Sequence, residues 1–183
     1  MIRTFIALPI PVEIKEKLRS AVSLLSEKNT GVKWVRPEGM HITLKFLGDI
    51  EEARIPELSR DLDAVTEEFS PISLYFSGYG VFPTWKRARV IWAGLAGDIE
   101  NLARLSASID RMCARHDIPA EMRAFSAHIT LGRRKVPSVV DLGIELIDGE
   151  FTSYEVLLYK SELLRTGARY TVLHRSRLGH KGG

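Results

Sequence analysis

The sequence predicts an α+β protein made of two pseudo-symmetric lobes of antiparallel sheet, with helices on the outside and a central cleft. The first observation behind this prediction is a tetrapeptide, His-Ile-Thr-Leu, that occurs at residues 41–44 and again at 128–131. The chain has five histidines, and the odds of such a chance repeat are about one in five hundred. The second observation is that the same series of elements, a strand, a turn, a helix and a short strand, precedes each of the two motif strands.

The spacing of these elements indicates an internal duplication. An apolar strand begins at Arg3, 38 positions before His41, and another begins at Arg89, 39 positions before His128. Two similar lobes facing each other would bring the two motif strands together. We therefore predict a single bilobal domain over 1–183, with an internal repeat at approximately 3–80 and 89–160 and a closing strand at about 169–177.

The elements of the first repeat follow from hydrophobic periodicity and from breaker residues. A helix is expected where Ile14, Leu18, Val22 and Leu25 recur at helical spacing after two prolines. Alternating or continuous apolar runs predict strands, and glycine clusters predict loops. The expected elements are strand 3–8, helix 12–28, short strand 32–35, motif strand 41–48, helix 51–69, strand 71–79 and a loop around Gly78, Gly80 and Pro83.

The second repeat is predicted by the same criteria. Asp98 is the expected N-cap of a helix whose inner face carries apolar residues at helical spacing. The expected elements are strand 89–95, a helix from 99 to about 112, a turn and short strand within 116–124, motif strand from 128, a weaker helix over 139–146, strand 151–159, the closing strand, and a frayed tail at 180–183.

Composition limits the classes of protein that are possible. The chain of 183 residues is 45% hydrophobic and 27% charged, with a net charge of +3, which is ordinary for a globular domain and only weakly favours an anionic partner. Cys113 is the single cysteine, so no internal disulfide forms and a buried thiol is expected. No apolar run reaches the roughly 20 residues of a membrane span, and no signal peptide is evident. We expect a cytoplasmic monomer.

Each motif strand offers one polar and one apolar face. Alternate side chains of a strand share a face, so His41 and Thr43 point one way, and His128 and Thr130 do so in the second copy. A single strand histidine is usually structural, but a duplicated one favours acid–base chemistry. Two imidazoles can hold opposite protonation states near neutral pH, and flanking hydroxyls can donate to phosphate oxygens. This pattern suits phosphoester cleavage.

Competing chemistries find less support in the residues. Two histidines are too few ligands for a divalent metal ion, and threonine replaces a carboxylate poorly. No nucleophile elbow and no nucleotide-triphosphate loop is present, so neither a covalent intermediate nor ATP is expected. We therefore predict no metal and no cofactor.

The residues 41–48 and 128–133 resemble the paired His-x-Thr-x motifs of the two-histidine phosphoesterase superfamily. The resemblance is greatest to its RNA 2′,3′-cyclic phosphodiesterase branch, also called 2′-5′ RNA ligase or ThpR/LigT-like. Further segments that resemble this branch are 3–7, 82–83 with 89–92, and 161–163 with Gly167 and Tyr170.

The resemblance implies a bilobal fold and metal-independent hydrolysis of RNA 2′,3′-cyclic phosphate ends to 2′-phosphomonoesters, with reversible 2′-5′ ligation as a second mode of the same site. It implies that His128 is the general base, that His41 is the general acid, and that Thr43 and Thr130 hold the phosphate. The implied partner is RNA with a cyclic phosphate end, such as tRNA fragments or oligonucleotides. The natural RNA, and activity on small cyclic nucleotides or oligoadenylates, stay open.

Residues next to the motifs have alternative interpretations. Arg133 could bind the phosphate, but strict alternation places it opposite His128, where a solvated arginine is equally expected. Arg134 is an even number of positions after His128, so strict alternation places it on the same face as that histidine. By the same rule Lys45 shares the His41 face and is expected to contact RNA, whereas Phe46 is expected in the core.

The remaining aromatic and imidazole side chains are interpreted as structural. We expect Trp34, Trp85 and Trp92 to pack in the core rather than stack on bases. The three histidines that lack a companion threonine are considered incidental; they are His116, His174 and His180. Two rival functions stay open at this point: a non-catalytic RNA-end or nucleotide binding module on the same fold, and a structural partner protein.

Overall fold

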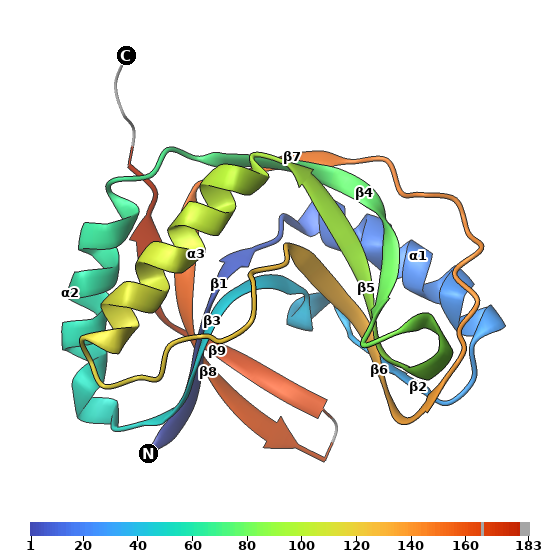
Figure 1. Cartoon of the computed structure of the whole chain (residues 1–183), viewed down its shortest axis with the longest axis horizontal. Helices are drawn as coiled ribbons and strands as arrows, with labels where there is room; N and C mark the ends of the chain where they lie inside the picture. Colours follow the sequence, from blue (N-terminus) through green and yellow to red (C-terminus); the bar gives the residue numbers. More distant parts are fainter. Residues whose placement is uncertain (166, 180–183) are drawn as a thin grey trace.

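The structure, a computed structural model, describes residues 1–165 and 167–179 and has an α+β fold built on two antiparallel sheets (Figure 1). The first sheet has the strand order β3-β1-β8-β9 and the second has the order β2-β6-β5-β4-β7. The predicted fold class is confirmed. The strands of the first sheet are β1 (Ile2–Pro9), β3 (His41–Ile50), β8 (Glu155–Leu164) and β9 (Gly167–Arg177). Those of the second are β2 (Val32–Trp34), β4 (Ile72–Phe82), β5 (Ala88–Gly97), β6 (His128–Ser138) and β7 (Glu150–Ser153).

The two sheets exchange strands between the halves of the sequence. β1 pairs with β3 on one side and β8 on the other, and β5 pairs in the same way with β6 and β4. β4 of the first repeat thus joins the sheet of the second, and β8 of the second repeat joins the sheet of the first. Each motif strand, β3 or β6, lies beside the opening strand of its own repeat, which fixes the two motifs in equivalent positions.

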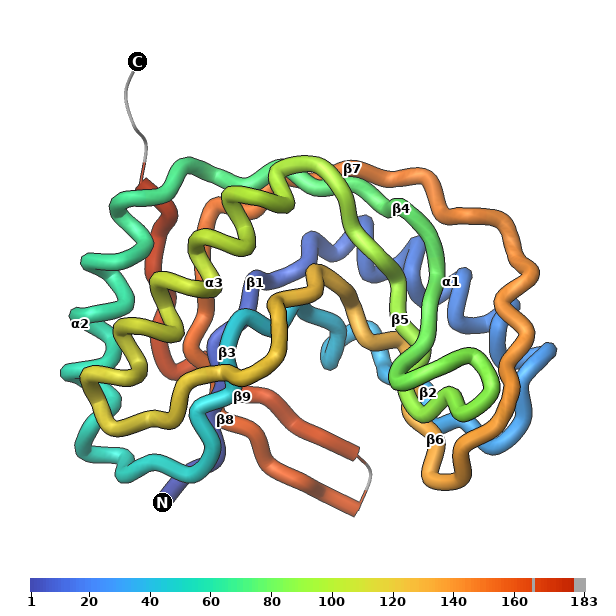
Figure 2. Tube along the Cα trace, viewed as in Figure 1, coloured from blue at the N-terminus to red at the C-terminus, as the bar shows by residue number. Residues whose placement is uncertain are grey.

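Helices cover the outer sides of the sheets. α2 (Ile55–Thr66) and α3 (Ile99–Ala114) pack on each other and against strands of the first sheet, whereas α1 (Val12–Lys28) lies beside the second sheet (Figures 1 and 2). Short 3₁₀ helices complete the chain: η1 (Pro37–Gly39), η2 (Glu52–Arg54) and η3 (Trp85–Arg87). The expected helix at 51–69 thus divides into η2 and a shorter α2, because Pro56 sits in the first turn of α2.

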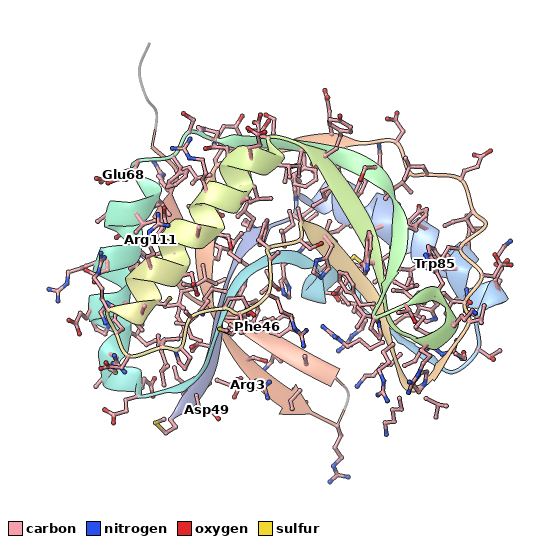
Figure 3. All side chains as sticks on the ribbon, viewed as in Figure 1. Arg3, Phe46, Asp49, Glu68, Trp85 and Arg111 are labelled. Atoms are coloured by element: carbon pink, nitrogen blue, oxygen red, sulfur yellow. The ribbon has the colours of Figure 1, made fainter. Side chains whose placement is uncertain are left out.

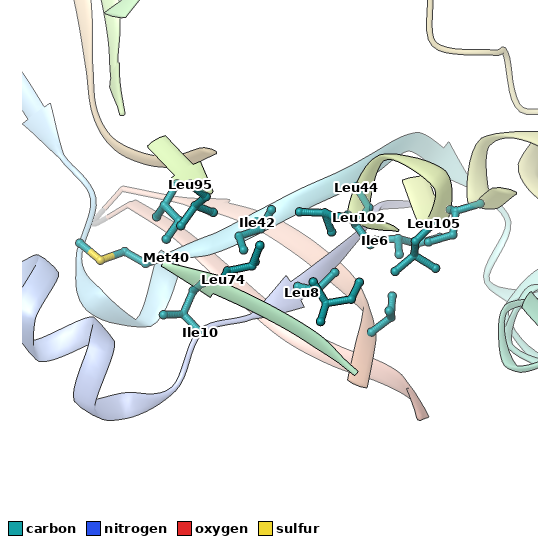
Figure 4. Packing of buried hydrophobic residues seen from close by; sticks show 14 of the residues in the cluster. Ile6, Leu8, Ile10, Met40, Ile42, Leu44, Leu74, Leu95, Leu102 and Leu105 are labelled. Atoms are coloured by element: carbon teal, nitrogen blue, oxygen red, sulfur yellow. The ribbon is translucent and has the colours of Figure 1, made fainter. Parts of the chain in front are cut away.

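The apolar faces of both motif strands are buried. Ile42 and Ile129 are fully covered, and Leu44 and Leu131 are also buried. Figure 4 shows Ile42 and Leu44 packed with β1 residues and with Leu102 of α3. Burying large aliphatic side chains of this kind contributes about 1.5–3 kcal/mol each. The core therefore fixes which side of each motif strand carries the polar residues.

Several predicted elements of the second repeat are wrong. Residues 139–146 are irregular and not helical; β-branched residues begin the segment, and α1 anchors its backbone instead. Lys28 Nζ donates to the Gly143 carbonyl at 2.9 Å, and Asn29 exchanges two hydrogen bonds with Asp141. The segment 116–124 contains no strand. The single strand expected at 151–159 is broken at Tyr154, so that β7 and β8 belong to different sheets.

Smaller differences concern turns and caps. Gly78 and Gly80 lie inside β4 rather than in a loop. Gly78, with φ of 149°, sits at a β-bulge, where a glycine is common inside a strand. Asp98 precedes α3 as expected, but its carboxylate accepts the backbone N–H of Ser73 and makes no cap bond. Cys113 is buried as predicted. The expected frayed tail, 180–183, lies outside the described residues.

Candidate active site

His41 begins β3 directly after η1 and is surrounded by aromatic rings. Its imidazole lies 4.7 Å from the ring of Phe5, 5.3 Å from that of Tyr170 and 6.2 Å from that of Tyr159, measured between centroids. A ring N–H donates to the backbone carbonyl of Gly39. Because one ring nitrogen is held in this way, the other is available to a ligand.

His128 begins β6 in an equivalent setting. Its Nδ1–H donates to the backbone carbonyl of Ser126 at 2.8 Å. The ring packs edge-on against Phe82 at 5.1 Å and lies 6.3 Å from Trp92. Both motif histidines are therefore oriented by the carbonyl two residues before them, with aromatic side chains on their flanks.

Burial lowers the pKa of both imidazoles. For His41 the pKa falls from 6.5 to about 4, chiefly through burial, which the hydrogen bond to Gly39 opposes. The positive charges of Lys15, Arg133 and His128 lower it further. Burial is also the main reason that the pKa of His128 is lowered. Both rings are consequently neutral at pH 7 while no anion is bound.

The two motif strands contact each other across the sheets. His41 lies close enough to His128 and Arg133 for their charges to act on its imidazole, and Arg133 acts on His128 as well. Thr43 and Thr130 are partly buried on the polar faces of β3 and β6, two residues after each histidine. One region thus combines two imidazoles, two hydroxyls and a guanidinium, which suits a tetrahedral anion.

A β-bulge in each motif strand changes the alternation that the sequence predicts. In β3 the pairing passes from Thr43 to Lys45, which leaves Leu44 without a partner, and in β6 it passes from Thr130 to Gly132, which omits Leu131. One extra residue moves all later side chains to the opposite face. Simple alternation is therefore misleading just beyond both motifs.

The bulges reverse the faces that simple alternation gives to four residues. Lys45 was expected to contact RNA, but it is only 4% exposed and its Nζ donates to Asp110 at 2.5 Å and to the Pro119 carbonyl at 2.6 Å. Phe46 was expected in the core, but it is 59% exposed on the His41 side. Arg133 reaches the histidine face, and Arg134, which had the better alternation, points away from it.

Sequence reasoning missed several residues around the pair. Lys15 of α1 carries a charge near His41, although nothing in the helical pattern marks it. The aromatic residues around the two imidazoles come from distant strands, so no local signal identifies them as a group. Of the tryptophans, only Trp34 packs against the core as expected. Trp92 lies beside His128 and Phe82 instead, and Trp85 is 56% exposed on η3.

Two of the other histidines, His116 and His174, contact carboxylates of α2. His116 Nε2 lies 2.8 Å from a carboxylate oxygen of Asp61, and His174 Nε2 lies 2.8 Å from one of Asp63. His180 falls outside the described residues. In the described part of the chain, no group of three or more His, Cys, Asp or Glu is arranged to hold a metal ion. None of the helices in 1–165 and 167–179 is long and apolar enough to cross a membrane.

Comparisons with known proteins agree with this geometry. Residues 8–92 match the family model of LigT-like phosphoesterases. The chain is 33% identical to an RNA 2′,3′-cyclic phosphodiesterase of Aquifex aeolicus (strain VF5), covering 91% of this chain and 90% of that protein. This chain belongs to the LigT-like phosphoesterase family. The resemblance noted from the paired motifs and the predicted enzyme class, a phosphoesterase, are confirmed.

Other LigT-like proteins extend the comparison. An RNA 2′,3′-cyclic phosphodiesterase of Thermotoga maritima is also 33% identical, over 94% of this chain and 93% of its own length. The crystal structure of TT0787 of Thermus thermophilus superimposes with a TM-score of 0.86 at 29% identity, covering 98% of this chain and 100% of that one. Escherichia coli LigT complexed with 3′-AMP gives a TM-score of 0.84 at 26% identity, over 97% and 98% of the two chains.

Proposed function

We propose that this LigT-like phosphoesterase hydrolyses RNA 2′,3′-cyclic phosphate ends to 2′-phosphates, with His128 as general base and His41 as general acid. The observation that carries the proposal is the matched setting of the two imidazoles, each held by a backbone carbonyl two residues earlier, beside one arginine. The curated relatives named RNA 2′,3′-cyclic phosphodiesterase support the substrate class.

The proposed reaction balances with one water molecule. His128 removes a proton from water, whose oxygen attacks the phosphorus of the cyclic phosphate. The bond between phosphorus and the 3′ oxygen breaks, and His41 gives its proton to that oxygen. The products are a 3′ hydroxyl and a 2′-phosphomonoester. Ligation through a 2′-5′ bond is the same ring opening with an RNA 5′ hydroxyl in place of water as the nucleophile: the bond between phosphorus and the 3′ oxygen breaks, and the same two imidazoles transfer the protons.

The low pKa of His41 determines when this acid becomes protonated. Burial and the nearby charges of Lys15 and Arg133 keep the ring neutral in the free protein. A bound phosphate brings a negative charge next to the ring, which raises the imidazole pKa. We therefore expect His41 to take up its proton together with the substrate.

The other site residues have binding roles in the proposal. The hydroxyls of Thr43 and Thr130 donate to non-bridging phosphate oxygens, and Arg133 neutralises the charge that builds up there. The imidazoles carry out both proton transfers, so the proposed mechanism needs neither a metal ion nor a cofactor. The cytoplasmic location and the monomeric state stay predictions.

Product analysis tests the proposal. An oligoribonucleotide with a 2′,3′-cyclic phosphate end is incubated with the protein, and phosphorus NMR assigns the product. The expected product is the 2′-phosphate alone, formed equally well with a chelator, and 3′,5′-cyclic AMP stays intact. Either His41→Ala or His128→Ala should lower kcat by about 10²–10⁴. Binding of the cyclic end without turnover, or activity abolished by the chelator, would contradict the mechanism.

A further inference from the structure

Three chain segments beside the second motif carry basic residues and no acidic ones. Residues 30–37, 84–92 and 128–139 together contain eight lysines and arginines and no aspartate or glutamate. The whole chain has 26 basic and 23 acidic residues, so the rest of the molecule is net negative. Eight basic residues without one acidic residue is a stronger positive bias than a protein surface with mixed charges usually shows.

The fold brings these segments side by side. β2 and β5 both pair with β6, and η3 contacts β6. Lys33 lies directly opposite Arg133 in the β2–β6 ladder, so the two side chains share a face. Like charges in directly opposed positions destabilise a sheet unless an anion lies between them. The pair therefore offers two neighbouring positive charges to an anionic ligand beside the histidine site.

The same surface carries an exposed indole close to His128. Phe82 packs against the His128 ring, and after Pro83 and Thr84 the chain reaches Trp85 at the start of η3. Three residues span at most about 10 Å, so this tryptophan lies near the catalytic region. Figure 3 labels Trp85 on the lobe opposite the one that carries Phe46. Its 56% exposure leaves the ring available for stacking.

We propose that this basic strip, made of Lys33, Trp85, Lys86, Arg87, Arg133 and Lys135, binds the single-stranded RNA that leads into the cyclic phosphate end. All of its members are exposed. Phosphates of the chain are held by the cations, and one base stacks on the Trp85 indole, which is how proteins bind single strands without reading sequence. A duplex would keep its bases stacked and leave the indole unused. The inference rests on the proposed function and extends it to substrate length.

A preference for oligonucleotides over cyclic mononucleotides follows from this assignment. A cyclic mononucleotide reaches only the site around the two histidines, whereas a longer chain also contacts the basic strip. We expect a lower KM for a cyclic-ended oligoadenylate of about six nucleotides, within the usual range of single-strand site sizes, than for 2′,3′-cyclic AMP. We also expect that advantage to weaken as salt is raised.

Two variants test the strip, and one matched variant serves as control. The first combines Lys33→Gln, Lys86→Gln and Lys135→Gln, and the second is Trp85→Ala. The control combines Arg60→Gln, Arg111→Gln and Arg115→Gln, which removes the same charge from α2, α3 and the end of α3. KM and kcat are measured for both substrates. Fluorescence anisotropy measures the Kd of a labelled oligoadenylate ending in a 2′-phosphate across a salt series.

The expected result is a change confined to the oligonucleotide. Trp85→Ala should raise the KM and the Kd of the oligoadenylate about tenfold. The triple lysine variant should also weaken binding and reduce the slope of log Kd against log salt by about 2. For 2′,3′-cyclic AMP both variants should match the control. Equal losses on both substrates, or oligonucleotide binding unchanged from the control, would overturn the inference.

The two proposals fail in different ways. If the wild-type protein hydrolyses neither substrate, the proposed function is wrong, but the anisotropy series still shows whether the strip binds RNA. If the protein hydrolyses the oligoadenylate and 2′,3′-cyclic AMP with equal KM, the proposed function stands, but the proposal that the basic strip binds RNA is refuted.

Discussion

Replacing His41 with asparagine is expected to make the folded protein more resistant to acid. The folded pKa of about 4 lies below the value of 6.5 for a free imidazole, chiefly because the ring is buried. Between these two pH values the unfolded chain binds a proton that the folded protein does not. The free energy of unfolding of the wild type must therefore fall as the pH drops from 6.5 to 4, and His41 adds no further loss below pH 4.

The size of the effect follows from the two pKa values. A shift of this size reduces the free energy of unfolding by about 2 kcal/mol at pH 5 and about 3 kcal/mol at pH 4, relative to pH 8. Asparagine keeps a side-chain N–H that can serve as a donor, but it has no proton to gain. The difference between variant and wild type should thus change by about 2 kcal/mol between pH 8 and pH 5.

Urea unfolding at both pH values measures this difference. Contributions of the other titrating groups are common to the two proteins and cancel in the comparison. An NMR titration of the wild-type imidazole supplies the folded pKa independently. A variant-to-wild-type difference that is the same at pH 8 and pH 5 would refute the reasoning from burial.

Four further substitutions have expected outcomes that chemical denaturation and kinetics check. Ile42→Ala should lower the free energy of unfolding by about 2–5 kcal/mol, whereas Phe46→Ala should change it by no more than about 0.5 kcal/mol, because only the first side chain is buried. Lys45→Met should lower it by about 2–3 kcal/mol, since its carboxylate partner on α3 loses a buried cation; an unchanged midpoint would count against that pair. Gly80→Ala places a Cβ about 2.2 Å from the Trp92 ring, so both stability and kcat should fall, and a fully active, stable variant would be contrary to the packing.

The sequence was sufficient to predict the parts of the fold that depend on local periodicity. The strand from Arg3, the helix from Val12 and both motif strands follow from apolar spacing and from breaker residues, and all four are present. The exchange of strands between the two sheets could not be predicted in this way, because it depends on pairing between residues far apart in the chain. The irregular segment at 139–146 likewise takes its shape from α1.

The candidate site was predictable as far as the motifs themselves extend. A duplicated His-x-Thr pattern is a local signal, and the two histidines do lie in one region. Lys45 and Phe46 lie on the faces opposite to those expected, because a bulge at Leu44 shifts the alternation of β3. The bulge depends on how β3 pairs with β1, which the sequence pattern does not reveal. The exposure of Trp85 depends on the turn after Pro83, which composition does not reveal.

The paired-imidazole mechanism predicts a specific change in pH dependence when either histidine is removed. The measurement is kcat/KM for a cyclic-phosphate-ended oligoribonucleotide across about pH 4–9, in the wild type, His41→Asn and His128→Asn. The wild type should give a bell-shaped profile. The residual activity of His128→Asn should lose the acidic limb, and that of His41→Asn the basic limb. Both limbs persisting in either variant would contradict the division of roles between the two imidazoles.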